Sequence, residues 1–216
     1  MRIGTYYRYL VARRLDLPLS GNRLLDIGCY DGFLLSHVDA TFKVGIDTEP
    51  VAAFSDIQYV QGDFLEHNFG QERFDRVFAL DVLEHVKEDR MFVEKVVSLL
   101  SADGIAIIST PSKAISVFPP FAQAWVDRKW DHSHRRGYTR QEIGRLANGQ
   151  NAKLISWNCS LFRFFYLPLS LLWRTCPSLA KLLLRAITII DARLSGGDSG
   201  FYYVILTSQA QVPTNL

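Results

Sequence analysis

The sequence predicts an α/β fold built on a mainly parallel sheet. Between residues 22 and 110, short apolar runs alternate with amphipathic stretches, which is typical of successive strand–helix–strand units. A glycine-containing turn, residues 28–32, follows the first apolar run, and acidic residues end several of the others. Because open α/β sheets bind ligands at the carboxyl ends of their strands, these observations also predict a binding site at that edge.

Strands are expected where short apolar runs are bounded by Gly, Asp, Ser or Pro. In the first half of the chain these runs are Arg23–Ile27, Lys43–Ile46, Ile57–Val60, Phe74–Leu80 and Gly104–Thr110. Helices are expected at Phe33–Val38 and at Val86–Leu100. In the second of these, apolar side chains recur on one face of the expected helix. Asp103 and Gly104 are expected to end the connection before the next strand.

The second half of the chain continues the pattern. Thr139 and Glu142 have the spacing of a capping box, which predicts a helix that ends near Ala147. Strands are expected at Ala152–Trp157 and at Phe201–Thr207, the latter being rich in β-branched and aromatic residues.

The composition is that of a globular protein. Of 216 residues, 48% are hydrophobic and 21% charged, which excludes a disordered or fibrous chain. Three cysteines are too few for a disulfide framework, and Arg8, Arg13 and Arg14 interrupt the N-terminal segment where a signal peptide would be apolar. We therefore expect one domain, residues 1–216, in the reducing cytoplasm.

Charge is unevenly distributed along the chain. Residues 22–103 carry 16 acidic and 7 basic side chains, whereas the rest carries 17 basic and 6 acidic. This asymmetry indicates that the basic parts meet an anionic partner, unless their lysines and arginines are simply solvated.

The turn at residues 28–32 and the strand ends beside it suit a nucleoside. Glycines are needed where a backbone turns sharply and a ligand approaches it closely, and the helix N-terminus beyond offers N–H groups to a carboxylate. Asp47 ends the second strand 19 residues after Gly28, where it can accept hydrogen bonds from both ribose hydroxyls. Asp63 and Phe64 end the third strand and suit an adenine ring.

Together these segments resemble a class I S-adenosylmethionine-dependent methyltransferase, of the broad group that includes ubiquinone-type O-methyltransferases. The matching motifs cover about half the chain and are LLDIGCYDG (24–32), VGID (44–47), GDF (62–64), FDRVFALDVLEHV (74–86) and GIAIISTP (104–111). The resemblance implies a Rossmann-like seven-stranded sheet with helices on both faces and an antiparallel last strand. It also implies S-adenosylmethionine as cofactor, with S-adenosylhomocysteine as product. Such chains run almost directly from the sixth strand into the seventh, so residues 160–200 are expected to be an apolar and basic helical insertion before the last strand.

The same resemblance implies which residues hold the cofactor. Those around its methionine part are Asp26, Gly28, Cys29, Tyr30 and Gly32. Asp47, with Thr48 beside it, would hold the ribose, and Asp63 and Phe64 the adenine. Leu80 and Asp81 would line the side of the sulfonium group.

Tyr30 departs from the family pattern, which has glycine at this position. We expect Tyr30 to keep a negative φ and to turn its ring away from the loop, toward the substrate. A nicotinamide-dependent Rossmann enzyme is the rival interpretation, but the required G-x-G-x-x-G fingerprint fails at Tyr30 and Phe33.

A hydroxyl acceptor needs a base, and histidine is suited to that role near neutral pH. The candidates are His132 and His134, in a loop or lid at residues 111–138 that the resemblance places on the substrate side. Each has the alternative of being an ordinary exposed or hydrogen-bonded histidine. His85 is the weaker candidate, because the LEHV pattern accompanies many different substrates in the family.

The same loop carries further polar groups. Asp127, Asp131 and the two histidines could ligate a metal, but their spacing matches no strong zinc signature, so no metal is expected. Basic side chains suited to a substrate phosphate or carboxylate, or to a solvated lid, are Arg128, Lys129, Arg135, Arg136 and Arg140.

Residues 161–194 interrupt the alternation of strands and helices. They contain no run of 18 uncharged apolar residues, so a standard membrane span is not expected. From Arg174 onward a narrow polar stripe accompanies a wide apolar face, and the stripe is Ser178, Lys181, Arg185, Thr188 and Ala192. Such a helix fits a membrane interface, a cap over the core or a dimer interface.

We therefore expect an S-adenosylmethionine-dependent methyltransferase that acts on oxygen of a small or amphiphilic acceptor, such as a lipid, a quinone or a lipid-linked glycan precursor. Peripheral membrane contact would be made through residues 161–194. The alternative from a different class is a non-catalytic membrane-associated module that keeps the cofactor-binding fold. Nucleic acid is not expected as a partner, because no RNA-binding motif accompanies the basic residues. The oligomeric state is left open.

Overall fold

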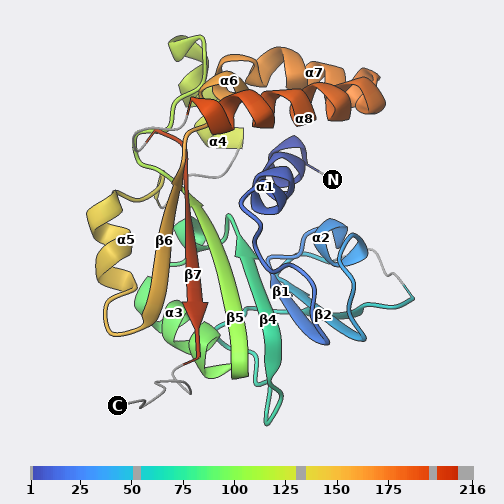
Figure 1. Ribbon diagram of the computed structural model, residues 1–216, viewed down its shortest axis with the longest axis vertical. Coiled ribbons are helices and arrows are strands. Elements are labelled where there is room, and N and C mark those ends of the chain that lie inside the picture. The colour runs from blue at the N-terminus through green and yellow to red at the C-terminus, as the bar shows by residue number, and fades with distance from the viewer. Residues whose placement is uncertain (1, 51–54, 130–134, 195–198, 209–216) are drawn as a thin grey trace.

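The computed structural model describes residues 2–50, 55–129, 135–194 and 199–208. These form a seven-stranded sheet in the order β3-β2-β1-β4-β5-β7-β6 (Figure 1). The strands are β1 (Arg23–Ile27), β2 (Phe42–Asp47), β3 (Gln58–Gln61), β4 (Phe74–Leu80), β5 (Leu100–Pro111), β6 (Asn151–Trp157) and β7 (Phe201–Thr207). Strands β1 to β5 pair in parallel, whereas β7 is antiparallel to both β5 and β6. The predicted sheet, with its antiparallel last strand, is confirmed.

Helices cover both faces of this sheet, as predicted. They are α1 (Ile3–Arg14), α2 (Phe33–Ser36), α3 (Asp89–Ser98), α4 (Gln123–Lys129), α5 (Arg140–Leu146), α6 (Ser160–Phe164), α7 (Tyr166–Thr175) and α8 (Pro177–Arg193), with short 3-10 turns η1 (Leu83–His85) and η2 (Pro120–Ala122). Successive strand residues point to opposite faces, so Leu24 packs in the cluster with α1, α2 and α6 to α8, and Leu25 in the cluster with α3 and α5.

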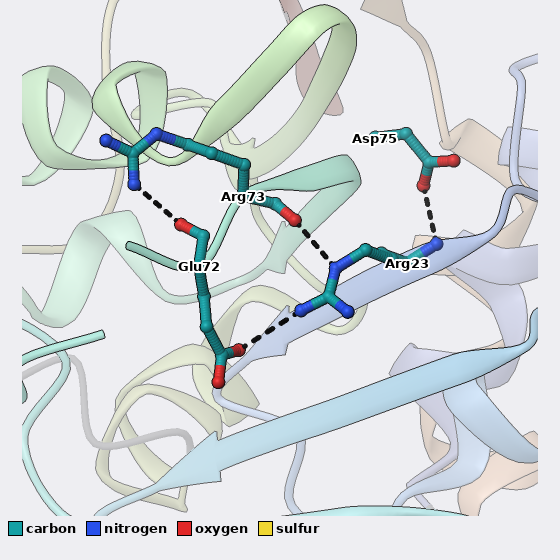
Figure 2. A network of polar contacts seen from close by, with 4 residues as sticks. All are labelled: Arg23, Glu72, Arg73 and Asp75. Carbon is teal, nitrogen blue, oxygen red and sulfur yellow. Dashed lines mark hydrogen bonds and ion pairs between the residues drawn. The ribbon is translucent and has the colours of Figure 1, made fainter. Parts of the chain in front are cut away.

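The amino ends of β1 and β4 are joined by a polar network (Figure 2). Asp75 accepts hydrogen bonds from the backbone N–H of Asn22, at 2.7 Å, and of Arg23, at 2.9 Å. The Arg23 guanidinium donates to the carbonyl of Arg73 at 3.0 Å and lies 3.5 Å from the Glu72 carboxylate. These contacts hold the start of β1 beside the start of β4, and the opposite ends of the same two strands lie side by side at the candidate site.

Two predicted boundaries, the start of β5 and the start of α3, differ from the structure by more than two residues. Strand β5 begins at Leu100, so the Asp103-Gly104 pair lies inside it and does not end the preceding connection. Phe74 pairs with Leu100 while Arg76 pairs with Ile105, so the residues between them form an irregularity within the strand. The helix expected over Val86–Leu100 is shorter, because η1 and a short loop precede α3.

Helix α1 was not predicted, and its burial explains why. Helix α1 packs in the same hydrophobic cluster as Leu24 and also contacts helix α8. Its buried residues therefore lie on all sides of the helix, and they include Tyr6, Tyr7, Arg8 and Tyr9. A helix without one apolar face and one polar face has no helical periodicity in its sequence.

Helices α6 to α8 connect β6 to β7 and lie across one end of the molecule, next to α1 (Figure 1). Among the described residues, no helix is both long enough and apolar enough to cross a bilayer. In α8 the side facing the protein carries Ala180, Leu184, Thr188 and Asp191. The predicted polar stripe is therefore wrong at Thr188, which is 2% exposed because it packs inward.

Candidate active site

A cavity of about 640 Å³ lies at the carboxyl ends of β1, β2 and β4 and beside the loop after β3. The sheet order reverses between β1 and β4, which is where open α/β sheets bind ligands. Of the residues predicted to hold a cofactor, those that line the cavity are Gly28, Tyr30, Asp47, Thr48, Asp63, Phe64 and Asp81.

Asp47 is held in place by the backbone on both sides of it. Its Oδ2 accepts the N–H of Tyr30 at 2.8 Å, and its Oδ1 accepts the N–H of Glu49 at 3.0 Å. These bonds join the turn after β1 to the end of β2 and fix the carboxylate at the cavity wall. A carboxylate oxygen can accept a second hydrogen bond, so a ligand hydroxyl can bind Asp47 without displacing either backbone donor.

Tyr30 adopts a φ of +50°, which corrects the expectation of a negative φ. The turn also places Gly28 at +70° and Gly32 at +67°, so three of its five residues are left-handed. A residue with a Cβ is disfavoured by about 1–2 kcal/mol in this region. The hydrogen bond to Asp47 opposes that cost, as does the Arg2 guanidinium, which lies 4.0 Å from the centre of the Tyr30 ring. The ring lies beneath Arg2 at the edge of the cavity.

The loop after β3 is fixed by a half-buried lysine, Lys95. Lys95 Nζ donates to the carbonyls of Leu65, at 2.8 Å, and His67, at 2.7 Å, and lies 5.2 Å from the centre of the Phe64 ring. Asp63 Oδ1 accepts the N–H of Leu65 at 2.6 Å. The loop that these bonds fix carries both Asp63 and Phe64, which line the cavity.

Four of the predicted cofactor residues are not among the described residues that line the cavity: Asp26, Cys29, Gly32 and Leu80. Asp26 is 4% exposed, and burial, together with the charges of Asp47 and Asp31, raises its pKa well above the usual range. Asp26 is therefore a buried residue of β1 and not one of the described residues of the cavity wall.

The sequence interpretation did not assign several residues of the cavity wall. These include Arg2, Glu49, Val82, Lys87, Glu88 and Phe92, along with His85, which was the weaker base candidate. Val82 and His85 lie within the motif FDRVFALDVLEHV (74–86), whereas Lys87 and Glu88 follow it, and Arg2 has no signal in the sequence because α1 is not predicted. The lining carries five carboxylates (Asp47, Glu49, Asp63, Asp81 and Glu88) against two permanent cations (Arg2 and Lys87). This balance favours a ligand with positive charge.

The predicted lid is described only in part. His132, His134 and Asp131 lie outside the described residues, so their roles stay predictions. Arg135 lies 3.5 Å from Asp89 and stacks at 4.4 Å on the ring of Tyr138, and Arg136 lies 3.6 Å from Asp127. These two arginines therefore make contacts within the protein.

Comparison with known proteins identifies the family. A family model described as a methyltransferase domain matches residues 2–156. A ubiquinone biosynthesis O-methyltransferase of Azorhizobium caulinodans is 34% identical over 136 residues, which are 53% of this chain and 53% of that protein. The chain thus spans about half the length of this curated relative.

Solved structures share the fold at low identity. Phosphoethanolamine N-methyltransferase 2 of Haemonchus contortus, in complex with phosphomonomethylethanolamine and S-adenosylhomocysteine, has a TM-score of 0.60 at 14% identity, covering 94% of this chain and 52% of its own. The N-methyltransferase NodS of Bradyrhizobium japonicum, with S-adenosylhomocysteine, has a TM-score of 0.54 at 14% identity, covering 95% and 85%. The chain therefore belongs to the methyltransferase-domain family, with the class I fold and S-adenosylmethionine as its cofactor.

Proposed function

We propose that this protein transfers a methyl group from S-adenosylmethionine to an oxygen of an amphiphilic acceptor, such as a lipid, a quinone or a lipid-linked glycan precursor. The observation that supports it best is the cavity at the switch point of the sheet, with Asp47 and Asp63 held at its wall by backbone N–H groups. The name of the Azorhizobium relative supports oxygen as the acceptor atom and a quinone precursor as its class.

The residues of the cavity fit this cofactor by their chemistry. When bound, S-adenosylmethionine supplies a methyl group activated by a positively charged sulfur. The excess of carboxylates in the lining suits that sulfur and the ammonium group of the cofactor. Asp47 would accept from the ribose hydroxyls, Asp63 from the adenine amino group, and the Phe64 ring would pack on the base. Arg2 would meet the carboxylate of the methionine part.

The protein contributes alignment and a base. Because methyl transfer is a direct displacement, most of what an enzyme supplies is the placement of the acceptor oxygen against the methyl group. His132 and His134 remain our candidates to take the proton from the acceptor hydroxyl.

An exposed layer of apolar and basic side chains favours an amphiphilic acceptor and contact with a membrane surface. Leu171 is 65% exposed and Leu182 62%. Within residues 160–194, five basic side chains accompany one acidic side chain, Asp191, which is buried. A bilayer with anionic lipids complements such a surface, whereas a second copy of it would meet like charge.

The loop at η2 and α4 extends this apolar surface. Phe121 is 87% exposed and Trp125 50%, and Phe118 stacks on Phe164 of α6 with ring centres 4.6 Å apart. A Trp side chain favours the headgroup region of a bilayer, and Phe is common on the apolar face of helices that lie in the interface.

Catalysis is tested with labelled S-adenosylmethionine and a polyprenyl catechol in anionic liposomes. We expect label in the organic phase, and about tenfold less for Asp47→Ala, since a charge-assisted hydrogen bond contributes about 1.5–3 kcal/mol. Asp103→Ala, an exposed residue of β5, is the matched control. Cofactor binding without transfer to this catechol, or to phenol and lipid extracts offered in the same way, would favour the non-catalytic alternative.

Membrane contact is tested by sedimentation with anionic liposomes at low salt. We expect the wild type in the pellet, and the double variant Leu171→Glu/Leu182→Glu in the supernatant. Met91→Glu is the control, because Met91 is 58% exposed on α3, outside this layer. A wild type left wholly in the supernatant would overturn the membrane proposal and leave catalysis unaffected.

A further inference from the structure

Helix α1 places a buried arginine against the wall of the cavity. Arg8 is 9% exposed, and its guanidinium forms an ion pair with the carboxylate of Asp81, which follows β4 and lines the cavity. Arg8 is not among the described residues of the cavity lining, so it reaches Asp81 from the protein side.

The guanidinium of Arg8 is itself held in position. Its central carbon lies 4.1 Å from the centre of the Phe201 ring, and the carbonyl of Arg8 accepts the Tyr203 hydroxyl at 3.2 Å. Gly4, one turn earlier, leaves room for it, because a Cβ at that position would lie 2.8 Å from Nη1 of Arg8. Arg8 is therefore fixed by β7 and by its own helix before any ligand binds.

Asp81 has a strained backbone conformation and lies beside two ionisable side chains, Arg8 and Glu84. Its φ is +58°, in the left-handed region, and its N–H donates to the carbonyl of Ser109 at 3.0 Å. Glu84, three residues later, is 2% exposed and accepts the Thr110 hydroxyl at 3.1 Å. Burial and the charge of Asp81 raise the pKa of Glu84 to about 8, while Arg8 opposes that rise. Without Arg8, the Asp81 carboxylate would lie beside Glu84 without its compensating cation.

We infer that Arg8 is a positioning residue, which holds the Asp81 carboxylate at the cavity wall through their ion pair and thereby sets the affinity for the cofactor from outside the cavity. This inference rests on the proposed function and on the expectation, from the family resemblance, that Asp81 lines the sulfonium side of the cofactor.

The neighbouring residue on α1 offers a matched control. The Tyr7 hydroxyl donates to Asp191 Oδ2 of α8 at 2.6 Å and accepts Nε1–H of Trp157 at 3.1 Å. Tyr7 is fully buried, stacks on Phe162 of α6 and is not among the described residues that line the cavity. A change at Tyr7 therefore weakens the docking of α1 without touching the Arg8–Asp81 pair.

The test is calorimetric titration of S-adenosylhomocysteine into the wild type, Arg8→Met, Arg8→Lys and Tyr7→Phe, each with its unfolding curve. We expect Arg8→Met to bind about tenfold more weakly, which is about 1.4 kcal/mol. Arg8→Lys keeps the charge and should recover most of the affinity. Tyr7→Phe should bind within about twofold of the wild type although it unfolds more readily. Equal affinity of Arg8→Met and the wild type, or an equal loss in Tyr7→Phe, would overturn the inference.

A double-mutant cycle with Asp81→Asn isolates the pair. If Arg8 acts through Asp81, the variant Arg8→Met/Asp81→Asn binds no more weakly than Asp81→Asn alone, whereas additive losses would contradict the inference. If Arg8→Met alone does not fold, the comparison of the double variant with Asp81→Asn still tests the inference. The double variant removes both charges of the pair, so it leaves no carboxylate without its cation. A wild type that does not bind S-adenosylhomocysteine would refute the proposed function itself, which is a distinct result.

Discussion

The cavity and the helical layer beside it use their polar groups in opposite ways. Around the cavity, Asp47 and Asp63 are fixed by backbone N–H groups and still face the space where a ligand binds. In the layer of α1 and α6 to α8, buried polar groups such as Tyr7 and Asp191 bond to one another, and the outer surface is apolar and basic. The first region is preorganised for one small cationic ligand, and the second suits an extended amphiphilic surface.

The largest effect is expected where the helical layer is joined to the core. Asp191 accepts the Tyr7 hydroxyl and the N–H groups of Leu161, at 2.8 Å, and Phe162, at 3.3 Å. Asp191→Ala leaves these donors buried without an acceptor, and we expect it to lower the free energy of unfolding by about 3 kcal/mol, measured in urea. Asp103→Ala, on the exposed surface, should change it by less than about 0.5 kcal/mol. A loss no larger for Asp191→Ala than for this control would show that the layer is not held through this carboxylate.

A smaller effect, which depends on pH, is expected at the boundary between the two regions. Glu84 has a pKa of about 8 in the folded protein, above its usual value near 4.5, because of burial first and the charge of Asp81 second. The folded state therefore keeps a proton that the unfolded state loses, and this stabilisation is lost as the pH rises toward 8. Between pH 6 and 8 we expect the free energy of unfolding to fall by about 1 kcal/mol per pH unit.

Glu84→Gln removes this titration and serves as the comparison. Its unfolding curves should show a much weaker fall over the same range, because the amide cannot ionise. An equal fall in both proteins would mean that another group is responsible.

The smallest effect is expected at α5, outside both regions. The Thr139 hydroxyl accepts the N–H of Glu142 at 3.2 Å, and the Glu142 carboxylate accepts the N–H of Thr139 at 2.7 Å, which completes the predicted capping box. Thr139→Ala should cost about 1 kcal/mol of stability in thermal unfolding. It should leave cofactor affinity unchanged, and a change there would extend the candidate site to α5.

The sequence predicts the strands and strand ends around the cavity better than it predicts the helical layer. Strands β1, β4 and β7 have the predicted bounds, because apolar runs between turn residues are local signals. The strand-end acids Asp47 and Asp63 were found in the same way, and both line the cavity.

The remaining features depend on packing between distant segments. Helix α1 is buried all around and so lacks periodicity, and with it Arg2 and Arg8 escaped prediction. Tyr30 has a left-handed φ that its contacts with Asp47 and Arg2 stabilise, and these partners are distant from it in the sequence. Thr188 was placed on the outer stripe because one sequence cannot show which side of an amphipathic helix packs inward.

The most direct test of the account is the thermal shift of the wild type with S-adenosylmethionine and with S-adenosylhomocysteine, beside Asp47→Ala. At about 100 times its dissociation constant, a ligand stabilises the folded state by about 2.7 kcal/mol, which is a rise of about 5–10 °C for a chain of this size. We predict that rise for the wild type with both ligands, and about half of it for Asp47→Ala at the same concentrations, because tenfold weaker binding leaves a stabilisation of about 1.4 kcal/mol. A wild type that neither ligand shifts would contradict the assignment of the cavity as the cofactor site.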